Sequence, residues 1–288
     1  MDNLKRVKAK LETAEALPTL PVIASQAMAI ANDPDASMKD LADLISRDPP
    51  LTAKIINMVN SACYALRQSV GSLPLALTVL GMKEIVNLVV GVSMVSLFDK
   101  YEGSAFFNKE KFWSHSGDCA AYSRFLAGEL GLRKLRNESF LAGLVHDVGM
   151  LIMVQHFAGT YSKVLKASSE EEKPLEEIEA DLLGFTHAMV GNIAVKSWKF
   201  PDTLCEAVLL HHDSKACCDG NLMAILIYVI ETIGTEFEQR IPPRWVARSL
   251  EKSPVWKKLL SNGNSELEPS ELLEGMKAAV AEAPKISA

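Results

Sequence analysis

The stretch FLAGLVHDVGMLIMVQHF, residues 140–157, carries apolar side chains on nearly every side of the helix that it predicts. A helix that is apolar all round has to be buried, so we expect this one to run through the core of a helical domain. His146 and Asp147 lie in its middle. Successive residues of a helix point about 100° apart, so these two side chains can meet at one ion only by converging from different directions.

The buried pair has two competing explanations. A carboxylate such as Asp147 stays ionised in a core only with a charge partner or several hydrogen-bond donors. A metal ion with neighbouring histidines would satisfy both residues. A direct hydrogen bond between His146 and Asp147, holding two helices together, would do the same without a metal. For the dipeptide alone, the hydrogen bond is the favoured interpretation.

The distribution of the other histidines favours the metal. All six histidines of the chain lie between residues 115 and 212. Five of them lie on four separate predicted helices, beside acids or within apolar sequence: His115, His146, His187, His211 and His212. Imidazoles and carboxylates bind divalent transition metals and are costly to bury without such a partner. A helix dipole is a competing explanation for His211 and His212, which end a predicted helix.

His156 is the sixth histidine, and its position favours a different role. It ends the central helix in Gln155-His156-Phe157, well beyond His146, where a place at the protein surface is expected. The sequence contains no Gly-rich phosphate loop, no Ser nucleophile elbow and no zinc-finger spacing. The predicted chemistry therefore depends on the five other histidines and Asp147.

Helical signals continue along almost the whole chain, which predicts an all-α fold. Ser37 and Asp40 have the spacing of a capping box. Pro49-Pro50 ends one helical pattern, Pro74 opens another, and Gly81 interrupts the next. No stretch shows the sustained alternation of apolar and polar residues that a sheet of hairpins requires.

The helices of the second half can be placed approximately. One is predicted to begin near Trp113, and one to run from His187 to about Trp198. A third covers residues 203–212 after an N-cap at Asp202.

Three polar stretches predict boundaries or surface. Residues 99–111 separate the histidine-free part of the chain from the histidine-rich part. Residues 167–177 form a charged excursion, for which a solvated loop and helix start are expected. After about residue 262 the chain turns polar, and Ser270–Glu282 is predicted to form a terminal helix that packs weakly or not at all.

Composition narrows the class of protein. A chain of 288 residues, 48% hydrophobic and 23% charged, is ordinary for a soluble protein of one or two domains. Its net charge of -6 argues against a general nucleic-acid binder. The five cysteines form no C-x-x-C pair and no signal-peptide pattern occurs, so a reduced cytoplasmic location is expected. For Cys217-Cys218, two free thiols in a loop are favoured over a pair that binds a soft metal or forms a strained disulfide. The apolar run Ile85–Phe98 is shorter than the roughly 20 residues of a membrane span and predicts a buried helix.

Seven stretches of the chain resemble a known family. In the first half they are LPTLPVIASQAMAIANDP, DLADLISRDPPLTAKIINMVNSACY and SLPLALTVLGMKEIVNLVV. In the second half they are FWSHSGDCAAYSRFLA, FLAGLVHDVGMLIM, THAMVGNIAVKSWKFP and AVLLHHD. Over about residues 10–235 the chain resembles the HDOD domain proteins, a branch of the HD superfamily of helical metal-dependent phosphohydrolases.

The resemblance implies a fold and a division of the chain. The implied fold is an N-terminal helical subdomain packed on an HD-like helical bundle. The implied parts are residues 1–98 for the N-terminal subdomain, 99–111 for a connecting segment, 112–235 for the bundle with its metal site, and 236–288 for a C-terminal helical extension and polar tail.

The resemblance also implies a ligand set. HD-superfamily sites use a leading His, a His-Asp pair, further His residues and a late Asp. The matching positions here are His115, His146, Asp147, His187, His211 and His212, with Glu231 where the family has its late Asp. The longer side chain of Glu231 is a departure from that pattern.

Two further departures concern the substrate. The cyclic-dinucleotide phosphodiesterases of the superfamily carry a Lys shortly after the His-Asp pair, where this chain has Val148-Gly149-Met150. They carry a Gly-Tyr-Pro signature after the paired histidines, where Asp213-Ser-Lys-Ala stands here. The resemblance therefore implies kept metal ligands without the parts that read a substrate.

Three functional interpretations follow. The first is a regulatory HDOD protein of bacterial signal transduction that keeps the metal site and contacts other signalling proteins. The second is an active metal-dependent phosphohydrolase for a nucleotide or cyclic-dinucleotide phosphoester, with Asp147 as the catalytic bridging ligand and Lys196, Lys199 or Lys215 as the cation for phosphate. The third is a structural helical protein without metal.

The ligand types also indicate the cofactor, which would be one or two divalent transition-metal ions. Mixed histidine and carboxylate ligands suit iron, manganese, zinc or nickel, and the resemblance favours iron. Neither a nucleic-acid partner nor a membrane span is expected.

Overall fold

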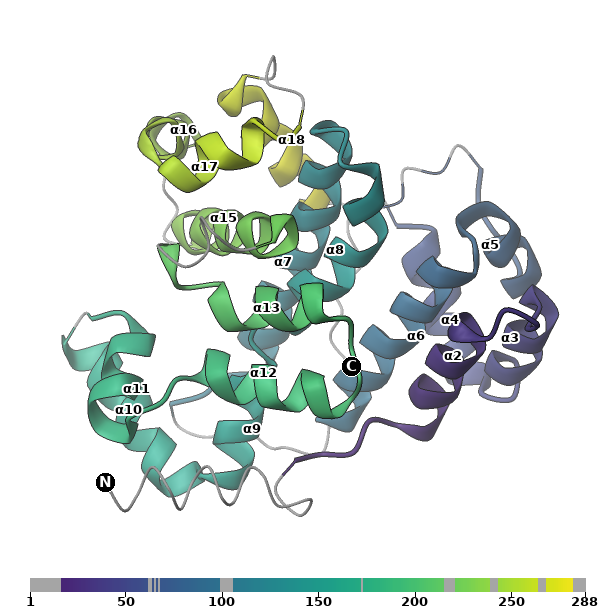
Figure 1. Ribbon diagram of the computed structural model, residues 1–288, viewed down its shortest axis with the longest axis horizontal. Helices are drawn as coiled ribbons and strands as arrows, with labels where there is room; N and C mark the ends of the chain where they lie inside the picture. The colour runs from purple at the N-terminus through teal and green to yellow at the C-terminus, as the bar shows by residue number, and fades with distance from the viewer. Residues whose placement is uncertain are drawn as a thin grey trace.

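Helices account for the whole architecture of the computed structural model within the residues that it describes (Figure 1). The described residues are 17–61, 64, 66, 68–98, 106–171, 173–214, 221–238, 243–263 and 268–281. The all-α prediction is therefore confirmed for this part of the chain. The predictions about Cys217-Cys218 and Lys215 lie outside the described residues.

The described residues of the first half of the chain form a unit of five helices, in which four pack around α6 or next to it. These helices are α2 (Val22–Asn32), α3 (Met38–Ile45), α4 (Pro49–Val59), α5 (Leu73–Leu80) and α6 (Met82–Leu97). The predicted capping box is confirmed, because the Ser37 hydroxyl accepts the backbone N–H of Asp40 and the Asp40 carboxylate accepts that of Ser37. Most of α6 is buried, and α2, α4 and α5 pack against it. The apolar run at 85–98 is thus the core helix of this unit.

The second half forms a bundle in which helices cross one another in layers. Its helices are α7 (Lys109–Glu129), α8 (Arg133–Val145), α9 (Val148–His156), α10 (Ala158–Glu171), α11 (Leu175–Leu183), α12 (His187–Ser197), α13 (Asp202–Leu210) and α15 (Leu222–Glu238). Helices α7 and α8 pack along each other, and α12, α13 and α15 stack across them (Figure 1). Helices α16 (Pro243–Lys252), α17 (Pro254–Leu260) and α18 (Pro269–Ala281) cover one end of the bundle.

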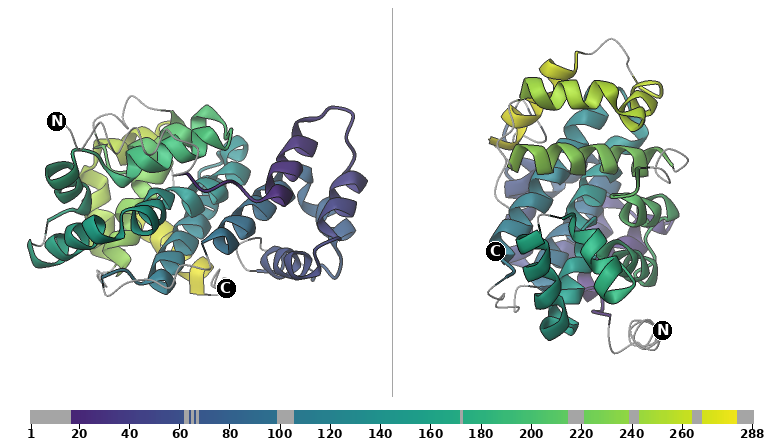
Figure 2. Two further views of the ribbon diagram at one scale, coloured as in Figure 1. Left: turned by 90° about the horizontal axis from the view of Figure 1, so that it is seen from below. Right: turned by 90° about the vertical axis from the view of Figure 1, so that its left-hand side faces the viewer.

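The N-terminal unit packs on one side of the bundle, as the resemblance implied (Figure 2). Helix α6 lies against α8, and a buried polar group joins α6 to α7. The Arg124 guanidinium and the Tyr64 hydroxyl both donate to the same oxygen of Glu84, each at 2.6 Å. Arg124 also lies 4.0 Å from the centre of the Tyr64 ring. Each buried charge therefore has an opposite charge and a further partner, which limits the cost of burying it.

The prediction of one continuous helix over residues 140–157 is wrong at its centre. Helix α8 ends at Val145 and α9 begins at Val148, so His146 and Asp147 form a turn between them. Asp147 has φ -96° and ψ 8°, outside the helical region. Because His146 and Asp147 lie in a turn and not within a helix, their side chains need not diverge by about 100°, and both can face the same side.

Several predicted boundaries also need correction. Helix α7 begins at Lys109, within the predicted connecting segment, because Asn108 caps it by accepting the backbone N–H of Lys111. Asp202 is the first residue of α13 and does not cap it with its side chain. Helix α10 continues to Glu171, so much of the charged stretch 167–177 is helical.

The terminal helix α18 packs more firmly than predicted. Leu272, Leu273 and Met276 are buried, and α18 lies against α7 and α16. These three apolar residues form a stripe at helical spacing, although the surrounding sequence is polar. Such a stripe is enough to attach an amphipathic helix to the bundle.

One described stretch, Arg133–His156, is long and apolar enough to cross a membrane. However, 83% of its apolar window is buried inside the bundle, and the stretch includes the turn at His146-Asp147. These properties are those of a core element of a soluble helical fold.

Candidate metal centre

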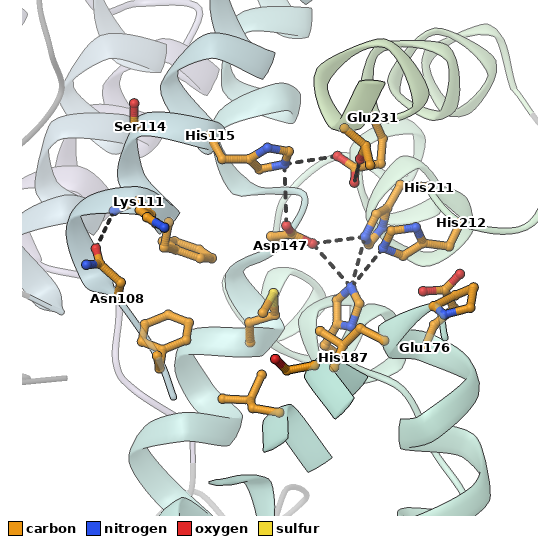
Figure 3. Close-up of a pocket in the computed structure, with 18 of the residues that line it drawn as sticks. Asn108, Lys111, Ser114, His115, Asp147, Glu176, His187, His211, His212 and Glu231 are labelled. Carbon is orange, nitrogen blue, oxygen red and sulfur yellow. Dashed lines mark hydrogen bonds and ion pairs between the residues drawn. The ribbon is translucent and has the colours of Figure 1, made fainter. Parts of the chain in front are cut away.

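Five segments far apart in the sequence bring the predicted ligands together around one pocket (Figure 3). His115 comes from α7, His146 and Asp147 from the turn between α8 and α9, His187 from the start of α12, His211 and His212 from the end of α13, and Glu231 from α15. Six of these side chains line the pocket, and His146 lies buried beside them. His156 lies exposed at the end of α9, apart from this group.

A first cluster consists of His115, His146 and Glu231. The Nε2 atoms of His115 and His146 lie 3.3 Å apart. One carboxylate oxygen of Glu231 lies 3.0 Å from His115 Nε2 and 3.2 Å from His146 Nε2. The structure therefore places the Glu231 carboxylate directly between two imidazoles, although its longer side chain departs from the family pattern.

A second cluster consists of Asp147, His187, His211 and His212. Their potential ligand atoms all lie within 4.8 Å of one another. His187 Nε2 lies 3.2 Å from the Nε2 atoms of both His211 and His212.

Asp147 connects the two clusters. One of its oxygens lies 3.2 Å from His187 Nε2 and 3.1 Å from His211 Nε2 in the second cluster. Its other oxygen faces the first cluster, 3.3 Å from His146 Nε2 and 3.7 Å from His115 Nε2. Each oxygen of this one carboxylate is thus directed at a different cluster.

The outer nitrogens of three histidines are held by groups outside the clusters. His146 Nδ1 donates to the carbonyl of Gly143 and His211 Nδ1 to that of Val208, both at 2.7 Å. His187 Nδ1 donates to the carboxylate of Glu179 at 2.8 Å. Because Nδ1 carries the proton in each neutral ring, Nε2 presents a lone pair.

These lone pairs provide a test of whether a metal fits. Nε2 of His187 and Nε2 of His211 face each other and the same oxygen of Asp147 at 3.1–3.2 Å. When both rings are neutral, as coordination of a metal requires, these three acceptors face one another with no proton between them, and without a metal a proton on His187 relieves part of their repulsion. A divalent cation shared by them would turn the repulsion into coordination, so the donor set fits a transition metal.

The charges of the cluster groups fit the same conclusion. Burial would raise the pKa of Asp147, but the neighbouring His146 holds that pKa well below its ordinary value. Burial likewise opposes ionisation of Glu231, whose contacts with His115 and His146 hold its pKa well below the ordinary range. Both carboxylates are therefore negative in the pocket.

The histidines divide into two groups by pKa. Burial opposes a charge on His146, yet the Asp147 carboxylate outweighs burial and raises the pKa of His146 well above its ordinary value. For His187, the Glu179 carboxylate outweighs burial and raises the pKa to about 10. Burial lowers the pKa of His211, and it lowers that of His212 to about 2. Two protonated imidazoles would balance the charges of Asp147 and Glu231, whereas His211 and His212 stay in the neutral form that binds a metal.

An outer layer that the sequence did not reveal holds His187 in place. The Glu179 carboxylate on α11 is fully buried and also accepts the backbone N–H of His187 at 2.8 Å. Its second oxygen accepts the hydroxyl of Tyr161 on α10 at 2.6 Å. Glu179 lies two residues after the charged stretch 167–177, for which sequence reasoning expected a solvated loop and helix start, and no local signal distinguished it from its exposed neighbours.

The pocket has a volume of about 1720 Å³ and includes cationic and aromatic side chains. Lys109 and Lys111 of α7 and Lys173 before α11 line it, as do Phe106 and Phe107. Lys196 and Lys199, which the sequence suggested as phosphate-binding cations, are exposed and are not among its lining residues. The sequence signal that could have identified Lys111 as a pocket residue was its spacing from His115, because residues four apart share one face of a helix.

Comparison with known proteins identifies the family. A sequence model of the HDOD domain matches residues 17–214. The chain belongs to the HDOD domain family. This HDOD protein is similar to an HDOD domain protein of unknown function from Geobacter sulfurreducens, with 25% identity and a TM-score of 0.78. That match covers 98% of this chain and 94% of the other.

Two further proteins are similar to this HDOD protein. One, from Shewanella amazonensis, bears the name "Putative metal-dependent phosphohydrolase"; it is 25% identical with a TM-score of 0.61, over 96% of this chain and 99% of the other. The other is an uncharacterised protein of Treponema pallidum, 20% identical over 197 residues. The match covers 68% of this chain but only 38% of that relative, so the chain spans less than half of its length.

Proposed function

We propose that this HDOD protein is a signalling module whose bundle binds two divalent transition-metal ions, one at each cluster, and whose pocket binds a phosphate-bearing ligand. The observation that carries the proposal is the position of Asp147, with one oxygen directed at each cluster. A carboxylate in this position is suited to bridge two cations. The signalling role and the contacts with other signalling proteins are inferred from the family resemblance.

The residues of each cluster have distinct parts in the proposal. His115, His146 and Glu231 would hold one ion, and His187, His211 and His212 the other, with Asp147 shared. Histidine and carboxylate ligands suit iron, manganese, zinc or nickel. When bound, such an ion supplies Lewis acidity to a phosphoryl oxygen and lowers the pKa of a coordinated water towards roughly 7.

Elemental analysis of protein purified without chelators tests the metal site. We expect about two transition-metal ions per chain in the wild-type protein and in Asp181→Asn, whose side chain is exposed on α11. Asp147→Asn should lose at least one of them, because it removes the shared charge. Wild-type protein that binds no transition metal, even after incubation with iron, manganese and zinc salts, would refute the proposal and favour a structural protein.

Binding of inorganic phosphate to the metal-loaded protein tests the ligand. Lys111→Gln should weaken binding by up to about fivefold, since an exposed charge pair contributes about 0.2–1 kcal/mol. Lys196→Gln is the matched control, because Lys196 is exposed and lies outside the lining of the pocket. Equal binding by both variants and the wild-type protein would contradict the assigned role of the pocket.

Hydrolysis of a phosphoester is the second candidate, and the accessibility of Asp147 favours it. Asp147, His187 and Glu231 line the same pocket as Lys111, so the clusters and the lysine border one cavity. In this reading Asp147 is catalytic, and the lysines balance negative charge on the phosphate. The name of the Shewanella amazonensis protein agrees with such a reaction.

Turnover separates the two candidates. Metal-loaded protein is incubated with nucleotide monoesters and with linear and cyclic dinucleotides, and release of phosphate or mononucleotide is measured. Turnover that disappears in Asp147→Ala and persists in Asp181→Asn would establish the hydrolase. Absence of turnover with full metal occupancy would leave the regulatory module.

A further inference from the structure

A cysteine lies against the first cluster at the distance of a ligand. Cys119 is four residues after His115 on α7, so both side chains lie on one face of that helix. Its sulfur lies 3.6 Å from His115 Nε2 and 4.0 Å from the Glu231 carboxylate. The ligand atoms of Cys119, His115, His146 and Glu231 all lie within 4.8 Å of one another. The Cys119 side chain is only 1% exposed.

The spacing of these four atoms is close to that of ligands around one ion, apart from the sulfur and the Glu231 oxygen, which lie 4.0 Å apart. Around a tetrahedral ion with bonds of about 2.0–2.1 Å to nitrogen and oxygen and about 2.3 Å to sulfur, neighbouring N and O ligands lie about 3.3 Å apart and an N–S pair about 3.6 Å apart. The observed N–N and N–O separations are 3.0–3.3 Å. The observed sulfur to nitrogen separation is 3.6 Å.

The backbone of α15 passes close to Cys119 and His115 at Gly234. A side-chain carbon on Gly234 would lie 3.2 Å from the Cys119 sulfur and 3.6 Å from a ring carbon of His115. The absence of a side chain at Gly234 thus lets α15 approach α7 closely. This approach brings Glu231, one turn earlier on α15, opposite the cysteine.

We propose that Cys119 is a further ligand of the first cluster, beside His115, His146, Glu231 and the shared Asp147, which makes this half of the site a mixed thiolate, imidazole and carboxylate centre for a thiophilic divalent ion such as Zn²⁺ or Co²⁺. This inference rests on the proposed metal-binding function and adds to it. Thiolate is a soft ligand, and the second cluster offers only nitrogen and oxygen. The two halves of the site therefore differ in the metals that they prefer.

Cobalt is the probe that tests the inference. The protein is freed of metal with a chelator, titrated with Co²⁺ under anaerobic conditions, and followed by absorption. Thiolate bound to Co²⁺ gives a near-ultraviolet charge-transfer band that nitrogen and oxygen ligands do not give. The wild-type protein should show this band, and it should saturate at one equivalent of Co²⁺ although the chain binds more.

Cysteine variants assign the band. Cys119→Ser should lose the charge-transfer band and bind Zn²⁺ at this cluster at least about tenfold more weakly. Loss of a group that only supports a ligand already lowers metal affinity by about tenfold or more, so loss of a ligand should cost at least as much. Cys205→Ser is the control, because Cys205 on α13 is equally buried but its sulfur contacts the carbonyl of Phe200, before that helix. It should keep both the band and the affinity, and far-ultraviolet circular dichroism checks that each variant is folded.

The outcomes separate this inference from the proposed function. Two equivalents of bound Co²⁺ without a thiolate band in the wild-type protein would overturn the role of Cys119 and leave the metal site standing. A band that persists in folded Cys119→Ser would also overturn it. Failure of the wild-type protein to bind Co²⁺ or Zn²⁺ at all would overturn both proposals.

Discussion

Replacing Glu179 with glutamine removes one negative charge next to the second cluster and changes little else. Glu179 accepts two hydrogen bonds from His187 at 2.8 Å and one from Tyr161 at 2.6 Å. A glutamine carbonyl in the position of the first oxygen can still accept both bonds from His187. The Tyr161 hydroxyl has only to rotate so that it accepts from the new amide.

The expected effect is on metal affinity. A hydrogen bond to a charged partner contributes about 1.5–3 kcal/mol and one to a neutral partner about 0.5–1.5 kcal/mol, so each bond to His187 weakens by about 1 kcal/mol. Two such bonds correspond to about 2 kcal/mol. Loss of a histidine's outer partner lowers metal affinity by about 10–100-fold, or roughly 1.4–2.7 kcal/mol. Both routes give the same range, so we expect Glu179→Gln to bind metal about 10–100-fold more weakly at the second cluster.

Competition with a chromophoric chelator for Zn²⁺ measures this affinity. Glu177→Gln is the control, because Glu177 is exposed on the same helix and its substitution removes the same charge. Urea unfolding of the metal-free variants separates a loss of affinity from a loss of stability. An affinity for Glu179→Gln within twofold of the wild-type value, or an equal loss in Glu177→Gln, would refute the assigned role of Glu179.

Three further predictions concern stability, each measured by urea unfolding. Gly149→Ala should destabilise the protein by several kcal/mol or prevent folding, because the new methyl group would overlap the backbone of His187. Gly159→Ala is the control: its methyl group would meet no atom within 4 Å, so this variant should be neutral or slightly stabilising. Burial raises the pKa of Glu84 above its ordinary value of 4.5, so its carboxyl contributes stability that is complete below that pH and is lost as the pH rises through the raised pKa. The free energy of unfolding of the wild-type protein relative to Glu84→Gln should therefore fall as the pH rises from 4.5 towards neutrality, and a constant difference would contradict this. Leu273→Ala should cost about 2–5 kcal/mol, because the side chain of Leu273, on α18, is buried, and a cost below about 0.5 kcal/mol would support a weakly packed terminal helix.

The existence and type of the helices followed from local sequence patterns. The capping box at Ser37, the helix start at Pro74 and the break at Gly81 all lie where the sequence predicted them. Each signal acts within a few residues, through a cap, a missing N–H or a change of backbone direction. Such signals survive in any tertiary context that permits a helix.

The errors arose where packing overrides a local pattern. The apolar pattern through His146 and Asp147 predicts one helix, but the structure has a turn there. The charged stretch 167–177 predicted surface, although Glu179, two residues after it, has a carboxylate that is fully buried beside His187. Composition reports the average environment of a segment and does not show which of its residues faces inwards.

The sequence by itself determined the all-helical fold, the family and the side chains able to bind a metal, because these depend on residue types and on spacing within single helices. Only the tertiary structure decided how those side chains meet. It directs the two oxygens of Asp147 at different clusters, sets Glu231 between two imidazoles and places Cys119 beside them. The physical reason is that side chains from five segments converge only through the packing of whole helices, and helical periodicity describes one helix at a time.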